Sequence, residues 1–215
     1  MKKGIVFFGA PGSGKGTQSA LLSENFNLPL VGIGKILRAE VTRGTPLGLE
    51  IEERLKCGEH LETQDVMKVL LTQLDKHQEE WILLDGVPRS MEQVEAVEAY
   101  RDHGILSIEA VIFLDIHSDD VLKRIRSRLS CVQCQKDYCH TVRVCTMCGS
   151  TKFTTRSDDK EDIVLNRLKV FNEGISDLLT FYRQKNLLYI IEANQSIEKV
   201  YNDIMKHLMP LMSSI

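Results

Sequence analysis

The feature that most constrains the fold is a glycine-rich stretch that follows a short apolar run near the N-terminus. Residues 5–8 are typical of a buried strand, and residues 9–17 then read Gly-Ala-Pro-Gly-Ser-Gly-Lys-Gly-Thr. A helical pattern follows directly at residues 18–26. Glycines let consecutive backbone N–H groups turn inward around an anion, and the start of a helix adds its dipole. The stretch therefore predicts a phosphate-binding loop between a strand and a helix.

This loop departs from the common phosphate-loop pattern at one position. The pattern G-x-x-x-x-G-K-[ST] places a hydroxyl directly after the lysine, whereas this chain has Gly16 there and a hydroxyl one residue later, at Thr17. Lys15 can reach the outer phosphates of a nucleotide, and the hydroxyl can help to order Mg²⁺. The alternative is a glycine-rich turn without a ligand, but the strand and helix on either side favour phosphate binding.

Apolar runs that alternate with helical patterns predict the fold class. Further strand-like runs occupy residues 81–84, 110–114 and 187–191. Helical patterns occupy residues 64–76, 91–100, 120–129, 159–183 and 197–208. Such alternation predicts a parallel sheet covered on both faces, which is a doubly wound α/β fold. Ligands of these sheets bind at the carboxyl ends of the strands, so Gly9, Asp85 and Asp115 are candidates for one site.

Two stretches interrupt this alternation and are interpreted as insertions into a single core. Residues 31–61 carry only short helical patterns, and residues 130–157 are rich in cysteine, threonine and serine. A chain of 215 residues can bury one sizeable core.

The charge balance and the apolar runs exclude further classes. The 27 Lys and Arg against 30 Asp and Glu give a net charge of −3, which gives no support for a general nucleic-acid surface. No apolar run approaches the ~18 residues of a membrane helix, and we expect a cytoplasmic protein.

The cysteines form two C-x-x-C pairs with ten residues between them, Cys131/Cys134 and Cys145/Cys148. Two such pairs can close a tetrahedral four-thiolate site, and a site without an open position is structural. The absence of a secretory signal indicates a reducing compartment, where clustered cysteines favour Zn²⁺ over disulfides. Free or redox-active thiols are the alternative. The intervening Cys139 and His140 are rival ligands, and the isolated Cys57 is expected to be a small buried hydrophobe.

The residues of the loop also carry a family resemblance. GAPGSGKGTQ over residues 9–18 resembles the phosphate loop of nucleoside monophosphate kinases, and most closely that of adenylate kinases. Further matches follow in order at residues 36–38 (Ile-Leu-Arg), 45–48 (Thr-Pro-Leu-Gly), 83–89 (Leu-Leu-Asp-Gly-Val-Pro-Arg), Gln93, Arg124, Arg128, 155–159 (Thr-Arg-Ser-Asp-Asp) and 166–168 (Asn-Arg-Leu). The resemblance spans essentially the whole chain.

The resemblance implies a P-loop NTPase-type, doubly wound, five-stranded parallel sheet with two mobile inserted segments. One segment closes over the nucleoside monophosphate (NMP) and the other, a zinc-containing lid, closes over ATP. The implied division is a core of residues 1–30, 62–128 and 158–215, an NMP-binding insertion of residues 31–61, and a lid of residues 129–157. The implied reaction is reversible phosphoryl transfer from Mg²⁺-bound ATP to AMP, giving two ADP, with lid closure excluding water.

The resemblance also assigns roles to individual residues. The catalytic set is Lys15, Asp85, Arg89, Arg124, Arg128, Arg156, Asp158, Asp159 and Arg167. The ATP-binding set is Gly12, Ser13, Gly14, Lys15, Gly16, Thr17, Arg124, Arg128, Tyr138 and Gln195. The AMP-binding set is Ile33, Arg38, Glu59, His60, Leu61, Gly86, Val87, Pro88, Arg89, Gln93, Arg156 and Arg167. The metal set is Cys131, Cys134, Cys145 and Cys148.

Within these sets, the arginines and aspartates have distinct expected tasks. Arginine suits phosphate because its planar fork binds two oxygens and keeps its charge. The helical pattern over residues 120–129 would place Arg124 and Arg128, four residues apart, on one face. Asp85 would orient hydrated Mg²⁺, and Asp158 and Asp159 would act at the lid hinge. The alternatives are solvated surface arginines and acids that interact with a helix dipole.

The acceptor region departs from the adenylate kinase pattern. Residues 32–35 read Gly-Ile-Gly-Lys, so Ile33 replaces a hydroxyl that lies beside adenine in the family and Lys35 replaces an acid. Val87 replaces an aromatic residue. Another acceptor such as UMP or CMP, or a non-catalytic module that binds nucleotide and zinc, therefore stays open. The resemblance implies a monomer without nucleic-acid or membrane partners.

Overall fold

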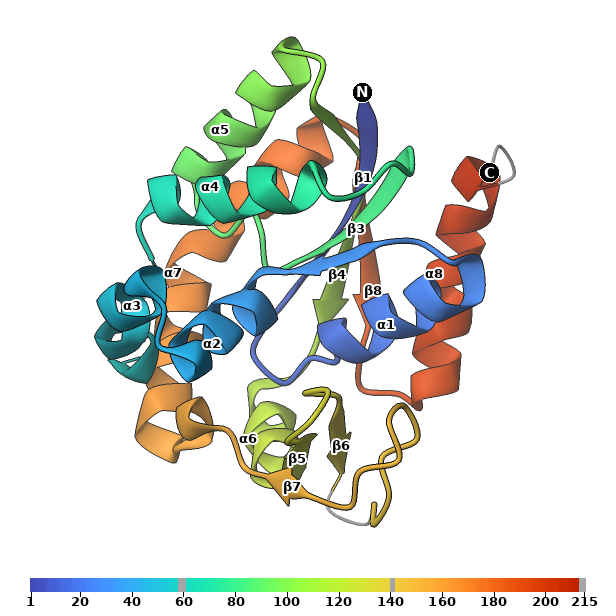
Figure 1. Cartoon of the computed structure of the whole chain (residues 1–215). Coiled ribbons are helices and arrows are strands. Elements are labelled where there is room, and N and C mark those ends of the chain that lie inside the picture. Colours follow the sequence, from blue (N-terminus) through green and yellow to red (C-terminus); the bar gives the residue numbers. More distant parts are fainter. Residues whose placement is uncertain (58–60, 140–141, 213–215) are drawn as a thin grey trace.

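A computed structural model describes residues 1–57, 61–139 and 142–212 of the chain. Among these residues, parallel strands form a five-stranded sheet in the order β2-β3-β1-β4-β8, as Figure 1 shows. The strands are β1 (Lys2–Gly9), β2 (Leu30–Gly32), β3 (Trp81–Asp85), β4 (Leu106–Asp115) and β8 (Leu188–Glu192). This confirms the predicted doubly wound α/β fold.

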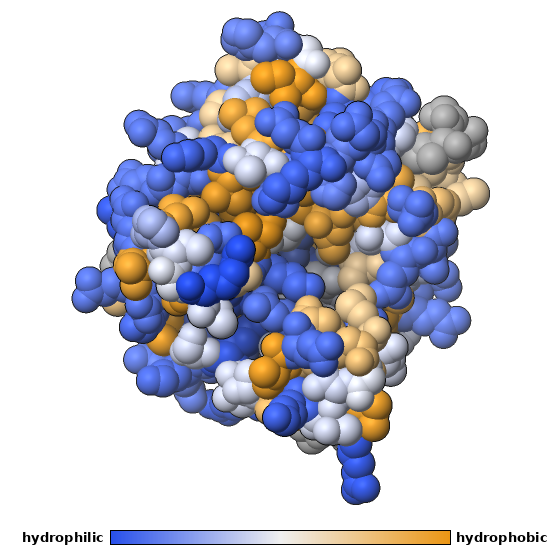
Figure 2. Space-filling model, in the orientation of Figure 1, coloured by the Kyte–Doolittle hydropathy of each residue, from blue (hydrophilic) through white to orange (hydrophobic). Residues whose placement is uncertain are grey.

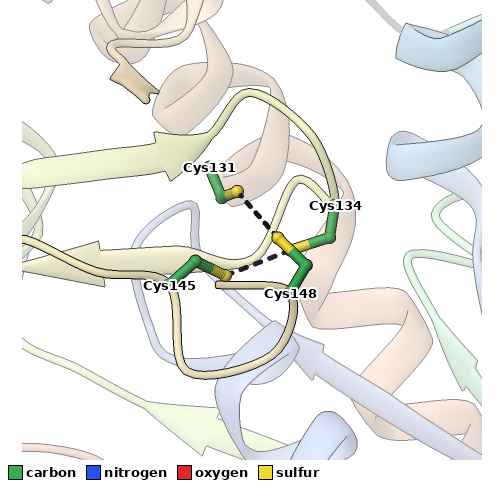
Figure 3. Close-up of side chains that lie close together, drawn as sticks. All are labelled: Cys131, Cys134, Cys145 and Cys148. Carbon is green, nitrogen blue, oxygen red and sulfur yellow. Dashed lines mark hydrogen bonds between the residues drawn. The ribbon is translucent and has the colours of Figure 1, made fainter. Parts of the chain in front are cut away.

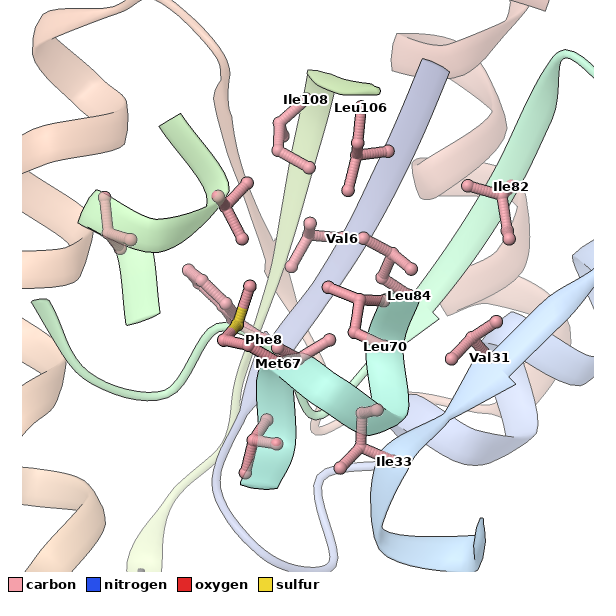
Figure 4. Packing of buried hydrophobic residues seen from close by; sticks show 14 of the residues in the cluster. Val6, Phe8, Val31, Ile33, Met67, Leu70, Ile82, Leu84, Leu106 and Ile108 are labelled. Carbon is pink, nitrogen blue, oxygen red and sulfur yellow. The ribbon is translucent and has the colours of Figure 1, made fainter. Parts of the chain in front are cut away.

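Helices cover both faces of this sheet. They are α1 (Lys15–Phe26), α4 (Thr63–Leu74), α5 (Met91–Asp102), α7 (Glu161–Gln184) and α8 (Ile197–Met212). β1 shows how the faces divide, since its buried side chains alternate between two apolar clusters. Val6 and Phe8 pack toward α4, α5 and α7, where Figure 4 shows them with Leu70 of α4. Ile5 and Phe7 pack in the cluster that contains residues of α1 and α8.

The stretch of residues 31–61 contains two well-formed helices, α2 (Ile33–Arg43) and α3 (Pro46–Cys57), rather than short helical patterns. Gly44 joins them with φ at 64°, a conformation that favours glycine. The helices pack so closely that a Cβ at Gly48 would lie 2.2 Å from the Glu40 carbonyl oxygen. The expected border between residues 30 and 31 falls inside β2. Cys57 is exposed, so the prediction that it is buried was wrong.

The second insertion forms a small antiparallel sheet in the order β6-β5-β7. Its strands are β5 (Arg128–Cys131), β6 (Asp137–Cys139) and β7 (Phe153–Thr154), and the 3₁₀ turn η1 (Ser157–Asp159) leads to α7. The sheet lies beyond the carboxyl ends of the core strands, beside α6 (Ser118–Arg126), as Figure 1 shows. Within the described part of the chain, no helix is long and apolar enough to cross a membrane.

The predicted helix over residues 120–129 ends too late. α6 ends at Arg126, the Ser127 hydroxyl donates to the Arg124 carbonyl over 3.0 Å, and Arg128 begins β5. Arg124 and Arg128 therefore do not share a helix face, and that prediction was wrong. The cause is the pairing of β5 with β6 and β7, which takes residue 128 out of the helix.

Candidate active site and metal centre

The glycine-rich loop connects β1 to α1 at the carboxyl end of the sheet. Gly9, Gly12 and Gly14 have positive φ angles of 147°, 79° and 100°, and this is the backbone turn that the glycines were predicted to allow. Lys15 Nζ donates to the carbonyl oxygens of Gly9 over 2.7 Å and of Ala10 over 2.9 Å. The lysine thus folds back over the loop, and its ammonium lies at the loop's centre.

The ammonium of Lys15 lies in an electropositive, poorly solvated environment. Burial is the main reason that its pKa falls from the ordinary 10.5 to about 7; the charge of Asp85 opposes this fall, and the nearby Arg89, Arg167 and Arg128 add to it. A bound polyanion would reverse this balance because phosphate charge favours the ammonium form.

Asp85 ends β3 next to the phosphate loop. It is paired in register with Phe7 of β1 and with Gly32 of β2. Its carboxylate accepts no hydrogen bond among the described residues, and a Cβ at Gly16 would lie 3.5 Å from its Oδ2. A side chain at position 16 would therefore contact this carboxylate, whereas Gly16 leaves that side of it uncovered. Asp115, the other strand-end acid, is exposed at the end of β4.

Asp158 brings arginines of different segments together. Arg167 of α7 donates to its Oδ2 over 2.8 Å, and Arg38 of α2 lies 3.8 Å from the same oxygen. Burial alone would raise the pKa of Asp158, but Arg167 and Arg38 offset this effect and lower it. Burial, followed by the charge of Arg156, lowers the pKa of Arg38 to about 10. The insertion of residues 31–61 and the core therefore share one charged cluster.

Arg128 and Asp159 form a second, more buried pair at the base of the small sheet. Arg128 donates through Nε to Asp159 Oδ2 over 2.9 Å and through Nη2 to Oδ1. Their side chains are 15% and 7% exposed. Burial would lower the pKa of Arg128, but the hydrogen bond to Asp159 raises it above its ordinary value. A bidentate pair of this kind is geometrically specific, so it orders the segment on both sides of the small sheet.

A pocket extends from the phosphate loop to the insertion of residues 31–61. Figure 2 shows a hollow at the centre of this face of the molecule, with hydrophobic residues along its upper rim. Charged side chains line part of the pocket: Lys15, Arg38, Arg89, Asp158 and Arg167. Apolar and small residues line the rest, including Ile33, Leu37, Leu55, Leu61, Val66, Gly86, Pro88 and Phe171. This combination suits a ligand with anionic groups and a flat, largely apolar portion.

The turn after β3 sets the position of Arg89 in this pocket. Gly86 has φ at 87°, and a Cβ there would lie 2.6 Å from Arg89 Nη2. The buried Gln93 accepts from the Arg89 backbone N–H through Oε1 over 2.8 Å. Val87 is fully buried in the apolar cluster and does not belong to the pocket lining. Glycine at position 86 is therefore required for the close approach of the guanidinium.

Three residues of the predicted ATP set form hydrogen bonds within the protein. Arg124 donates to the carbonyl oxygens of Ser13 and Ala193, so it ties α6 to the phosphate loop. The Tyr138 hydroxyl contacts the Cys145 sulfur at 3.3 Å, inside the small sheet. Gln195 donates to the Glu192 carbonyl over 2.9 Å. Their roles in ATP binding stay predictions, and the predicted Glu59 and His60 lie outside the described residues.

The four predicted metal ligands converge on one point, as Figure 3 shows. The sulfur of Cys131 lies 3.5 Å from that of Cys148, that of Cys134 lies 3.4 Å from that of Cys145, and all four sulfurs lie within 4.8 Å of one another. A tetrahedral ion bound at ~2.3 Å would separate its sulfurs by roughly 3.8 Å. The donor set and its spacing thus fit Zn²⁺. The rival ligands Cys139 and His140 lie outside the described side chains.

Each C-x-x-C turn ends in a left-handed residue. Gln135 follows Cys134 with φ at 57°, and Gly149 follows Cys148 with φ at 73°. The backbone N–H of each donates to the carbonyl oxygen of the first cysteine in its pair. The distances are 2.9 Å from Gln135 to Cys131 and 2.8 Å from Gly149 to Cys145. The two turns are therefore built alike, and each presents two sulfurs to the centre.

Asp137 and Ser130 were not among the site residues predicted from the sequence. Both are hydrogen-bonded to Arg156, whose Nη2 donates to Asp137 Oδ2 and whose Nε donates to Ser130 Oγ over 3.2 Å. One sequence feature could have indicated Asp137, because it is the single acidic residue between positions 129 and 157.

A parallel sheet with a glycine-rich loop that faces a lysine- and arginine-lined pocket defines a nucleotide-binding phosphotransferase of the P-loop type. The sequence profile of the adenylate kinase family matches residues 7–187. An adenylate kinase of Methanocella arvoryzae is 36% identical to this chain over 210 residues, and one of Geobacillus sp. (strain WCH70) is 35% identical over 208 residues. One of Methanosarcina barkeri is 33% identical over 207 residues. Each alignment covers 93% of this chain and 95% of the relative.

The chain belongs to the adenylate kinase family. It is therefore a nucleoside monophosphate kinase, an ATP:AMP phosphotransferase, and the zinc-lid type is consistent with the cysteine cluster.

Proposed function

We propose that this chain transfers a phosphoryl group from ATP to AMP, and back from two ADP, with the charged side chains of the pocket as its catalytic machinery. The observation that carries the proposal is the convergence of Lys15, Arg38, Arg89 and Arg167 on one pocket at the carboxyl end of the sheet. Phosphoryl transfer requires positioning and neutralisation of charge more than a covalent nucleophile. Four cations around one cavity supply both.

The two substrates would occupy different parts of this site. The phosphate loop and Lys15 would bind the ATP phosphates, with Arg124 and Arg128 from the lid side. Arg38 and Arg89 would hold the AMP phosphate, because both line the pocket beside Gly86 and Gln93. Ile33, Leu61 and Val66 would pack against the base, which gives affinity but little hydrogen-bond selectivity.

Asp85 and Thr17 are the residues that would hold hydrated Mg²⁺ with ATP. The Asp85 carboxylate suits this role because it lies beside Gly16 and accepts no hydrogen bond from the described residues. Mg²⁺ prefers oxygen ligands and keeps several waters, so one carboxylate, one hydroxyl and the phosphates suffice. When bound, the ion neutralises charge on the phosphate oxygens.

The four cysteines would hold one structural Zn²⁺ ion. The small sheet of β5, β6 and β7 has short strands, and a segment of this size has little apolar surface to bury, so metal ligation would supply its stability. A folded lid is needed because water in the closed site would hydrolyse ATP. We further propose that the enzyme is a cytoplasmic monomer that acts without nucleic-acid or membrane partners.

A coupled assay with ATP and each of AMP, UMP, CMP and GMP tests the proposed reaction. We expect turnover with AMP to exceed that with the other acceptors. Arg89→Ala should lower kcat/KM for AMP by about 100-fold, as for the loss of a preorganised charged donor. The matched control is Arg101→Ala, which removes an exposed arginine of α5 and should leave kcat/KM unchanged. Absence of turnover with every acceptor would refute the proposal, and a better pyrimidine acceptor would refute its AMP part.

A further inference from the structure

The lid segment of residues 129–157 contains one carboxylate, and that carboxylate is bound to an arginine of the candidate site. The segment carries the cations Lys136, Arg143, Lys152 and Arg156 but only Asp137 as an acid. Asp137 pairs with Arg156, and the two side chains are 27% and 16% exposed. A surface ion pair contributes little to stability, and the partial burial of this one suggests another purpose.

The pair with Asp137 is one side of a closed triad. Ser130 of β5 and Asp137 of β6 are directly opposite each other in the antiparallel register, so their side chains lie on the same face of the small sheet. The buried Ser130 hydroxyl donates to Asp137 Oδ1 over 2.6 Å and accepts from Arg156 Nε over 3.2 Å. Arg156 Nη2 donates to Asp137 Oδ2. Each member of the triad is therefore bonded to the other two.

The triad occupies only part of the Arg156 guanidinium. A guanidinium has five N–H donors, and the contacts to Ser130 and Asp137 use Nε–H and one of those on Nη2. Within the part of the chain that the structure describes, no hydrogen bond uses the other three. The charge of Arg156 also lies close to Arg38, because it is the largest influence after burial on the Arg38 pKa. Arg156 thus lies close to Arg38, with three N–H groups that no other described residue engages.

Without Asp137, little would keep the Arg156 guanidinium near Arg38. Arg38 carries like charge and repels Arg156, whereas Asp158 attracts it but is already bound to Arg167. Asp137 supplies the opposite charge from the same inserted segment as Arg156, so this contact does not depend on how the segment packs against the core. Preorganisation of this kind removes the entropy of ordering a long side chain from the binding step.

We propose that Asp137, together with Ser130, is a positioning residue that holds Arg156 by one edge so that its other edge binds a substrate phosphate. The inference rests on the proposed function, since it requires Arg156 to act on phosphate. Asp137 itself does not touch substrate. Its expected contribution is to kcat, through the geometry of Arg156.

Steady-state kinetics of Asp137→Ala and Asp137→Asn test this role. We expect Asp137→Ala to lower kcat by about tenfold, since small misplacements of a charged donor have effects of this order or larger. Asp137→Asn keeps an oxygen that can accept from Arg156, so we expect it to lose less than about threefold. The matched control is Asp119→Asn, which removes an exposed acid of α6 and should retain the kinetics of the unsubstituted protein. Zinc content should stay the same in all variants.

A double-mutant comparison separates positioning from a structural role. If Asp137 acts through Arg156, Asp137→Ala should have no further effect on kcat in an Arg156→Ala background. A tenfold loss in both backgrounds, unaltered kcat in Asp137→Ala or in Arg156→Ala, or loss of zinc from Asp137→Ala would each overturn the inference. Absence of transfer in the unsubstituted protein would instead refute the proposed function, so the two failures are distinguishable.

Discussion

Replacement of Lys15 by methionine should abolish phosphoryl transfer and at the same time stabilise the ligand-free protein. The ammonium lies in a site that burial and three arginines make unfavourable for positive charge. Methionine has a similar length and no charge, so it removes that penalty. Transfer should fall by at least about 100-fold, because the substituted chain lacks the cation that faces the outer phosphates.

The size of the stabilisation follows from proton linkage. A pKa of 10.5 in the unfolded chain and of about 7 in the folded chain corresponds to a penalty of about 4 kcal/mol at pH 7. Lys15 keeps some contact with solvent, so we expect about half of this, ~2 kcal/mol. Between pH 7 and 10.5 the unfolded chain binds more protons at this site than the folded chain does. The unsubstituted protein therefore gains stability as pH rises through this window, and the advantage of methionine falls below about 1 kcal/mol at pH 9.5.

Urea unfolding of both proteins at pH 7 and pH 9.5 measures this difference. With an m value of about 2 kcal/mol/M, the midpoint of Lys15→Met should rise by roughly 1 M at pH 7 and by less than half of that at pH 9.5. Lys199→Met, at an exposed position of α8, is the control and should show no comparable pH-dependent gain. A loss of stability at pH 7, or a gain of equal size at both pH values, would refute the electrostatic reasoning.

Three further outcomes are expected. Protein purified without added zinc should contain about one zinc ion per chain. Joint replacement of Cys145 and Cys148 by serine should remove this ion and should increase hydrogen exchange in the lid before it does so in the core. Unchanged metal content would point to other ligands. Gly48→Ala should lower the free energy of unfolding, measured in urea, by about 1–3 kcal/mol, because the added Cβ would clash with the Glu40 carbonyl. A variant as stable as the unsubstituted protein would mean that α2 and α3 can move apart without cost. Ile33→Thr should lower KM for AMP with little change in kcat, as a restored hydroxyl contributes ~0.5–1.5 kcal/mol, and unaltered AMP kinetics would contradict this account of the acceptor site.

Much of the core could be predicted from the sequence because its signals are local. The strand-like runs at residues 5–8, 81–84 and 110–114 fall inside observed strands, and the run at residues 187–191 begins one residue before β8. A strand buried on both faces is a continuous apolar run, and this pattern is visible without knowledge of its neighbours. β2 escaped detection because three residues are too few to establish a period.

The candidate site divides in the same way. The phosphate loop and the cysteine pairs are short segments in which the spacing of residue types already implies the geometry. The contacts of the charged residues are not local, since Arg38 meets Asp158 and Arg128 meets Asp159 across long sequence separations. Spacing alone wrongly placed Arg128 on a helix with Arg124.

The sequence by itself determined the class of fold, the glycine-rich loop and the two cysteine pairs that form one cluster. These features depend on backbone conformations and residue spacings that are specified within a few neighbouring positions. Only the tertiary structure decided which acid pairs with which arginine, where α6 ends and β5 begins, and that Asp137 is bound to Arg156. Ion pairs depend on distance in space, and strand pairing can override the helical preference of a short segment, so neither can be read from a single stretch of sequence.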